Sequence, residues 1–430
     1  MTYEKAMDFI HNSEKLGSVL GLDNMYNLMA QLGNIQNELK IIHIAGTNGK
    51  GSVGAFTSGI LKNAGFKVGR YVSPTITEYL ERFQINDMII EKEKFCSLCE
   101  KVQNAIEKMI VDGKSHPTAF EIETAIAFLY FYEEKCDFVL LETGLGGRLD
   151  ATNIIEKNIC SVITSISYDH TQFLGDTLSD IAYEKCGIIK ENCPVVSIEQ
   201  DDEAMSVIEK VSKEKKSDLT IVKKSDIAYT EFENDYQIFD YQDLKDIKIK
   251  LLGKFQTENA SIAISIAKLL ISKGFSISTE NIYNGLFETV WQGRFQVIMK
   301  KPLFIVDGAH NEDAAKRLRE TIKLYFQNRK ITYIVGIFKD KNYKRIIELT
   351  ADLADKIYTI QLDNPRRLDI DTLTNEFLVY NQNTEKTNNV EDAIDKSLSN
   401  SKDEDVIIAF GSLSYLGDVI KIIRKKGELQ

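Results

Sequence analysis

A lysine between glycines follows a short apolar run. The stretch reads IIHIAGTNGKGSVGAF from Ile41 to Phe56, and Gly51 separates Lys50 from Ser52. In a glycine turn that opens a helix, backbone N–H groups bind anions, the lysine contacts β- and γ-phosphates, and the serine hydroxyl can ligate Mg²⁺. The commonest such loop, G-x-x-x-x-G-K-[ST], has no residue between lysine and hydroxyl. The pattern therefore predicts a phosphate-binding loop of unusual spacing; a flexible turn with a solvated Lys50 is the alternative.

Polar side chains end two further apolar runs. The run Phe138–Leu141 precedes Glu142. The run Ser161–Ile166 leads shortly to Asp169 and His170. Because the carboxyl ends of parallel strands meet at one edge of an α/β sheet, we expect these side chains near the glycine loop. A carboxylate there suits Mg²⁺, and an imidazole can also bind a metal. Without a metal, Glu142 would face solvent and His170 would be an ordinary core or surface residue.

The elements that must position these residues follow an α/β pattern. Short apolar runs alternate with helical stretches, which predicts a mostly parallel sheet covered by helices, as in P-loop NTPases. Residues 218–252 alternate apolar and polar side chains, which predicts a small antiparallel β addition. The parallel pattern restarts as a smaller, Rossmann-like α/β domain with predicted strands at Leu303–Val306, Thr332–Gly336, Ile357–Ile360 and Val406–Phe410. We expect two domains, 1–293 and 294–430, because 430 residues exceed one ordinary core.

Composition narrows the class of protein. Lys and Arg number 53 against 64 Asp and Glu, a net charge of −11, which argues against nucleic-acid and membrane-surface partners. No transmembrane span or signal peptide is visible. Six cysteines are scattered, and the C-x-x-C of Cys96 and Cys99 falls in a predicted helix, so a reduced pair is favoured over a zinc site. We expect a cytoplasmic protein.

The glycine loop and several later motifs resemble the Mur ligase superfamily. GTNGKGS, with its Gly51, is similar to the folylpolyglutamate synthase and dihydrofolate synthase branch. The resemblance runs through most of the chain, in the motifs LLETGLGGRLDATN, SYDHTQFLGD, AYEKCGI, KFQTENA, WQGRF and IVDGAHN. It implies a monomeric ATP-dependent ligase that joins L-glutamate to a folate or dihydropteroate carboxylate through an acyl phosphate.

The resemblance also implies roles for individual residues. For ATP it implies Thr47, Asn48, Gly49, Lys50, Gly51, Ser52, Asn259, Arg294 and Asp307. For magnesium it implies Ser52, Glu142 and His170, and for catalysis Lys50, His170 and Lys185. The family's lysine at the position of Lys185 is carbamylated by CO₂, which requires a neutral amine, favoured by burial or nearby cations. A solvated helix lysine is the alternative.

Acceptor binding is implied for a further set: Ser73, Arg82, Phe120, Asp150 and His310. Thr75 and Gln292 depart from the family pattern, where many relatives have histidine and proline. Two alternatives stay open: another Mur-superfamily ligase acting on a cell-wall or other carboxylate, and an ATP-binding regulatory protein without ligase activity. The motifs leave open whether dihydropteroate, tetrahydrofolate or both are accepted.

Overall fold

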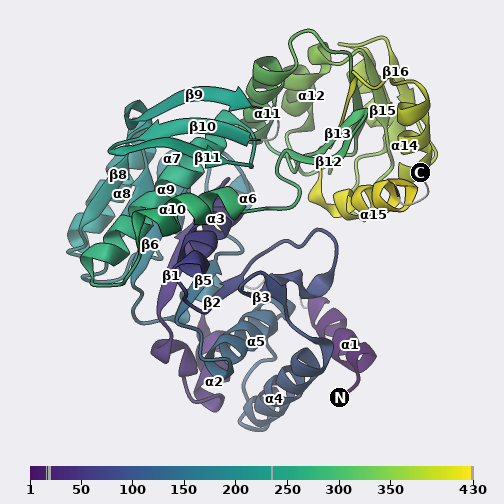
Figure 1. The fold of residues 1–430 in the computed structure, drawn as a ribbon. Helices are drawn as coiled ribbons and strands as arrows, with labels where there is room; N and C mark the ends of the chain where they lie inside the picture. Colours follow the sequence, from purple (N-terminus) through teal and green to yellow (C-terminus); the bar gives the residue numbers. More distant parts are fainter. Residues whose placement is uncertain (16, 18–20, 234–235, 428–430) are drawn as a thin grey trace.

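The computed structural model describes residues 1–15, 17, 21–233 and 236–427, which form the mixed α/β architecture of Figure 1. Its larger sheet has the strand order β4-β3-β2-β5-β1-β6-β7-β8. The strands are β1 (Ile41–Ala45), β2 (Val68–Tyr71), β3 (Phe83–Ile85), β4 (Met88–Ile89), β5 (Phe138–Glu142), β6 (Cys160–Ile163), β7 (Val195–Ile198) and β8 (Leu219–Val222). β3 pairs antiparallel with β2 and with β4, and the other neighbouring pairs are parallel.

Helices cover both faces of this sheet, and every residue of the central β1 is buried. α1 (Tyr3–Glu14), α2 (Asp23–Gln31), α4 (Lys92–Val111) and α5 (Ala119–Glu133) share one hydrophobic cluster with Ile41. α3 (Lys50–Asn63), α9 (Lys254–Ser272) and α10 (Thr279–Glu288) share another with Ile42 and Ile44. α6 (Thr171–Leu174), α7 (Leu178–Cys186) and α8 (Asp202–Glu214) complete this part. Burial on both faces explains why β1 is a continuous apolar run rather than an alternating one.

A separate three-stranded antiparallel sheet contains β9 (Ile227–Glu233), β10 (Tyr236–Tyr241) and β11 (Leu244–Ile249). The expected antiparallel addition is therefore present. Its predicted extent is wrong at the first strand, because β8 pairs parallel with β7 at the edge of the larger sheet. An edge strand has only one neighbour, and β8 is mostly half-buried or exposed, so its pattern resembles that of an antiparallel strand.

The C-terminal part is a six-stranded sheet of order β12-β13-β17-β14-β15-β16. Only β12 is antiparallel to its neighbour. Its strands are β12 (Gln296–Lys300), β13 (Leu303–Val306), β14 (Ile331–Val335), β15 (Lys356–Thr359), β16 (Thr384–Lys386) and β17 (Val406–Phe410). Its helices are α11 (Glu312–Tyr325), α12 (Tyr343–Thr350), α13 (Ile370–Leu378), α14 (Val390–Ser399) and α15 (Leu416–Gly427). Separate hydrophobic clusters lie on its two faces.

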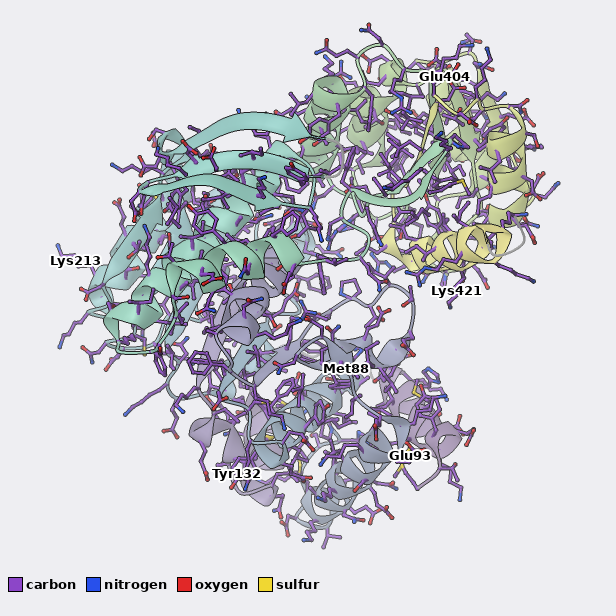
Figure 2. The ribbon with its side chains drawn as sticks, in the orientation of Figure 1. Met88, Glu93, Tyr132, Lys213, Glu404 and Lys421 are labelled. Atoms are coloured by element: carbon purple, nitrogen blue, oxygen red, sulfur yellow. The ribbon has the colours of Figure 1, made fainter. Side chains whose placement is uncertain are left out.

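The chain passes once from the first part to the second, through residues 289–295 between α10 and β12 (Figure 1). The limits 1–293 and 294–430 stay our proposed domain division. Charged side chains such as Lys213, Glu404 and Lys421 project outward from the periphery (Figure 2). Among the described residues, no helix has the length and hydrophobicity needed to span a membrane. Cys96 and Cys99 are free thiols buried on α4.

Candidate active site

The glycine loop joins the end of β1 to the start of α3. Gly49 has a φ of 93°, in the left-handed region, and no described side chain caps the helix. The first N–H groups of α3 therefore keep their capacity to bind an anion. Lys50 Nζ donates a hydrogen bond to the Gly46 carbonyl at 3.0 Å and lies 3.9 Å from Glu142 Oε1. Asn259 of α9 reaches the loop, since a Cβ on Gly49 would lie 2.6 Å from its Oδ1.

Lys185 projects from α7 toward the same loop. Its side chain is buried, and its Nζ donates to the Gly46 carbonyl at 3.0 Å, so two lysine amines share one acceptor. Burial, with the positive charge of Lys50, lowers the pKa of Lys185 to about 7. A large fraction of neutral amine is therefore present near neutral pH, which is the form that reacts with CO₂.

Glu142 ends β5 and is 7% exposed. Burial raises the pKa of Glu142 to about 7, although Lys50, Arg294 and Arg70 oppose the rise. Its carboxylate accepts no hydrogen bond from the described residues, and its ion pair is the 3.9 Å contact with Lys50. A buried carboxylate without hydrogen-bond donors fits the role of a ligand for a hard cation, as does the nearby hydroxyl of Ser52.

These residues do not complete a metal site alone. Within the described part of the chain, no group of three or more His, Cys, Asp or Glu side chains is placed to hold a metal ion. His170 lies beyond β6 with a φ of 52°, and its side chain is 42% exposed. Burial lowers the pKa of His170, and the neighbouring Asp169 opposes the change. A metal held by Ser52, Glu142 and His170 would need further oxygen ligands from outside the protein.

Asp169 connects the N-terminal and C-terminal parts of the chain through hydrogen bonds. Its Oδ1 accepts from Lys341 Nζ at 2.7 Å, and its Oδ2 accepts from Asn311 Nδ2 at 2.9 Å. Burial alone would raise the pKa of Asp169, but the Lys341 ammonium and His170 hold it well below its usual range. Lys341 could not be predicted from the sequence, because no local pattern marks a cation whose partner lies 172 residues away.

Asp307 and His310 follow β13 at the facing edge of the C-terminal sheet. The Asp307 carboxylate accepts from the backbone N–H groups of Phe295 at 2.8 Å and Ala309 at 2.9 Å. Burial and the positive charge of Lys341 lower the pKa of His310 to about 4. The neutral imidazole has its Nδ1 2.7 Å from the Gly308 carbonyl, so Nδ1 carries the proton and Nε2 the lone pair.

Every predicted site residue lines one or both of two adjoining cavities. The first, of about 170 Å³, is lined by residues 46–52, Glu142, His170, Lys185, Asn259, Arg294, Asp307 and His310. The second, of about 640 Å³, is lined by Arg82, Phe120, Asp150 and others. Ser73, His170 and His310 belong to both linings. The predicted nucleotide and acceptor residues thus meet along a shared boundary.

Two predicted acceptor residues are also bound within the protein. The Arg82 guanidinium forms an ion pair with the buried Glu123 and lies 4.4 Å from the ring centre of Tyr79. The Asp150 carboxylate accepts from Leu145 N at 2.8 Å and Thr152 N at 3.0 Å. Glu123 was not predicted, because it lies within a helix, α5, whose pattern indicates packing. Of the two departures from the family pattern, Gln292 lines a third cavity of about 320 Å³ beside α3, and Thr75 lines both this cavity and the second one.

Comparison with known proteins identifies relatives along the whole chain. The family models "Mur ligase middle domain" and "Mur ligase, glutamate ligase domain" match residues 44–267 and 293–413. A Bacillus subtilis dihydrofolate synthase/folylpolyglutamate synthase is 34% identical, over 98% of this chain and 99% of its own. The folylpolyglutamate synthase of Thermotoga maritima superposes with a TM-score of 0.86 at 31% identity, covering 99% of this chain and 97% of its own.

Escherichia coli FolC in complex with DHPP and ADP also matches, with a TM-score of 0.86 at 28% identity over 98% of each chain. The middle-domain model alone spans more than half of the 430 residues, and the B. subtilis relative aligns nearly end to end. The chain therefore belongs to the Mur ligase family, within its branch of folylpolyglutamate and dihydrofolate synthases.

Proposed function

We propose that the protein is an ATP-dependent ligase that joins L-glutamate to a carboxylate of folate or dihydropteroate. The observation that carries the proposal is the shared boundary of the two cavities at Ser73, His170 and His310. A γ-phosphate at the glycine loop and a carboxylate reaching in from the larger cavity would meet there. The acceptor carboxylate attacks the γ-phosphorus and ADP leaves, so an acyl phosphate forms in a partly enclosed space.

Lys50 and the first N–H groups of α3 bind the β- and γ-phosphates in this proposal, and Arg294 approaches from the segment that leads into β12. Asn259 and Asp307 bind the rest of the nucleotide. Related folylpolyglutamate synthases have been solved with ADP and with AMPPCP. Two fixed cations near the transferred phosphoryl group stabilise the charge that develops on its oxygens.

Mg²⁺ would be held by Ser52, Glu142 and His170, where it would supply charge neutralisation for the phosphates. The Glu142 carboxylate, which accepts no hydrogen bond from the described residues, and the Ser52 hydroxyl are oxygen donors of the kind this ion prefers. Phosphate oxygens would complete the ligand set that the protein leaves incomplete.

Lys185 would be carbamylated. The neutral amine attacks the carbon of CO₂, a nitrogen–carbon bond forms as one C=O π bond opens, and one proton is released, so that the neutral amine becomes an anionic carbamate. A ¹³C-bicarbonate-treated protein should show one carbamate carbon resonance that is missing in Lys185→Ala. We expect that variant to lose most activity and to regain part of it with a short carboxylic acid. Full activity of Lys185→Ala in the absence of any added carboxylic acid would contradict a carbamate on Lys185.

His310 would accept a hydrogen bond from the incoming glutamate amine and orient it. Its Nε2 has the lone pair at neutral pH, because Nδ1–H is held by the Gly308 carbonyl. The amine then attacks the acyl phosphate carbon, and phosphate leaves through a tetrahedral intermediate. No covalent enzyme intermediate is required, so positioning and charge neutralisation account for catalysis.

The decisive experiment measures glutamate-dependent phosphate release with dihydropteroate, tetrahydrofolate and a UDP-muramyl acceptor. We expect release with one or both pterins and none with the muramyl compound. Extension of the muramyl acceptor alone would favour a cell-wall ligase. ATP binding without glutamate-dependent release would favour a regulatory protein.

We also propose that the protein acts as a cytoplasmic monomer. Every residue proposed for the reaction comes from one chain and lines one pair of cavities, so no second copy is needed to complete the site. Light scattering of the purified protein should give the mass of a single chain, 48.8 kDa.

A further inference from the structure

The single tryptophan of the chain, Trp291, lies in the segment between α10 and β12. One part of its indole lies against Gly51: a Cβ there would be 2.8 Å from Trp291 Cζ2 and 2.9 Å from Nε1. The guanidinium carbon of Arg70 lies 4.7 Å from the ring centre. The indole therefore contacts both the phosphate loop and a buried arginine of β2.

Arg70 is a fixed partner for the ring. It is 4% exposed, and its Nη2 donates to Gln84 and, at 3.3 Å, to Asp87. A desolvated guanidinium stacks on an aromatic ring more strongly than an exposed one. The Trp291 Nε1 has no hydrogen-bond partner among the described residues, so packing and stacking hold the ring.

α3 and α10, which lie next to the contact between Trp291 and Gly51, are also closely packed against each other. A Cβ on Gly59 of α3 would lie 2.4 Å from Thr289 Oγ1, and a Cβ on Gly285 of α10 would lie 2.5 Å from the backbone of Ile60. α10 and the residues up to Trp291 are thus fixed to the phosphate-loop helix without space for another methyl group. Immediately afterwards the chain turns at Gly293, with a φ of 66°, and enters the cavity with Arg294.

We propose that Trp291 is a positioning residue that fixes the base of the Arg294 segment on the phosphate loop. The indole sets where Arg294 lies relative to Lys50, and Gly51 separates Lys50 from Ser52 because the ring occupies the space of a side chain there. The inference rests on the proposed binding of ATP at this loop. It accounts for the unusual spacing of the loop by a contact made 240 residues later in the chain.

Two glycines of the same helix provide a matched test. Gly51→Ala places a methyl group against the indole, whereas Gly54→Ala places one 3.6 Å from Ile44 Cδ1, an ordinary contact. We expect Gly51→Ala to weaken ATP binding, measured by calorimetry, at least tenfold, and Gly54→Ala to change it less than threefold. Adding Trp291→Leu to Gly51→Ala should restore part of the affinity, because the clash is removed. Equal effects of the two alanines, or additive losses in the double variant, would overturn the proposal.

A second pair of variants, Trp291→Phe and Trp291→Leu, tests the same proposal if Gly51→Ala does not fold. Trp291→Phe keeps a flat ring and should keep ATP affinity and kcat within about threefold, whereas Trp291→Leu should lower kcat at saturating ATP more than it raises KM. Equal kinetics of the Phe and Leu variants would contradict positioning by the ring.

Because Trp291 is the only tryptophan, its fluorescence reports this contact directly. Titration of wild type with ATP should change its emission with the same midpoint as the calorimetric binding curve. Calorimetric binding with unchanged emission would overturn the inference and leave the proposed function standing. Absence of ATP binding in wild type would instead overturn the proposed function.

Discussion

Two strand–loop–helix turns face each other across the first cavity, and they differ in whether a side chain caps the N-terminus of the helix. The turn from β1 to α3 places Gly49 before the helix without a side-chain cap. The turn from β13 to α11 caps its helix with Asn311, whose side chain accepts from Ala314 N at 2.9 Å. The first turn keeps its N–H donors for a ligand, whereas the second uses one of them, the Ala314 N–H, in an internal cap and presents side chains to the cavity. The same local topology thus yields an anion site on one side and a rigid support for Asp307 and His310 on the other.

The largest effect should come from removing the cation of the first turn. We expect Lys50→Met to lower kcat/KM by about 10³, because a fixed charge at the transferred phosphoryl group is lost. The matched change in the second helix is Lys316→Met, which removes a half-exposed lysine paired with Glu312. That variant should stay within about twofold of wild type in the phosphate-release assay. Comparable losses in both would mean that the two turns are not functionally distinct.

Buried histidines on both sides of the cavity should make stability sensitive to acid. His310, which follows β13, has a pKa lowered to about 4 by burial and by Lys341, and burial lowers the pKa of His43 on β1 further, to about 3. At His43 the unfolded chain therefore binds a proton below about pH 6.5 that the folded protein excludes until about pH 3, so this group costs stability as pH falls. From pH 7 to pH 5 the cost is about 2 kcal/mol.

Urea unfolding at both pH values should show this loss in wild type and about 2 kcal/mol less of it in His43→Gln. His116, a partly buried histidine elsewhere in the chain, provides the control. An equal pH dependence in wild type and His43→Gln would show that the imidazole is not excluded from protonation.

Carbamate formation should depend on pH through Lys185. With a pKa of about 7, the amine is mostly protonated at pH 6 and mostly neutral at pH 8. The neutral fraction rises roughly tenfold between these values. The initial rate of ¹³C-carbamate formation, compared at equal dissolved CO₂, should rise by a similar factor. A flat profile would contradict the lowered pKa.

The smallest expected effect comes from removing helix N-caps, and it distinguishes a loss of stability from a loss of activity. Asn311→Ala and Asn389→Ala each remove a helix N-cap, on α11 and α14, and each should cost about 1 kcal/mol of stability. Only Asn311 also contacts Asn48 of the phosphate loop, at 3.2 Å, and Asp169. We therefore expect kcat/KM to fall several-fold in Asn311→Ala alone. A similar fall in Asn389→Ala would attribute both losses to stability.

Sequence alone located the strand ends and the residues beyond them. The predicted bounds of β13 and β17 match the structure, because parallel strands buried on both faces are continuous apolar runs. The glycine loop, Glu142 and Lys185 lie together because strand order brings their elements to one edge. The contacts of Asp169 with Lys341, and of Trp291 with Gly51, could not be predicted, since they depend on how two distant segments pack. β8 was misplaced for a related reason, because its half-exposed edge gives no sign of its parallel partner.

The Gly46 carbonyl shared by Lys50 and Lys185 implies an order of events. Burial and repulsion from Lys50 together give Lys185 its neutral form near pH 7. A polyphosphate bound beside Lys50 would offset that repulsion and favour the protonated amine, so the proposed carbamate would form more readily before the nucleotide binds. Protein stripped of CO₂ and mixed first with ATP should start turnover after a lag, whereas protein incubated first with bicarbonate should start at once. The initial activity would then depend on whether CO₂ or ATP had reached the site first.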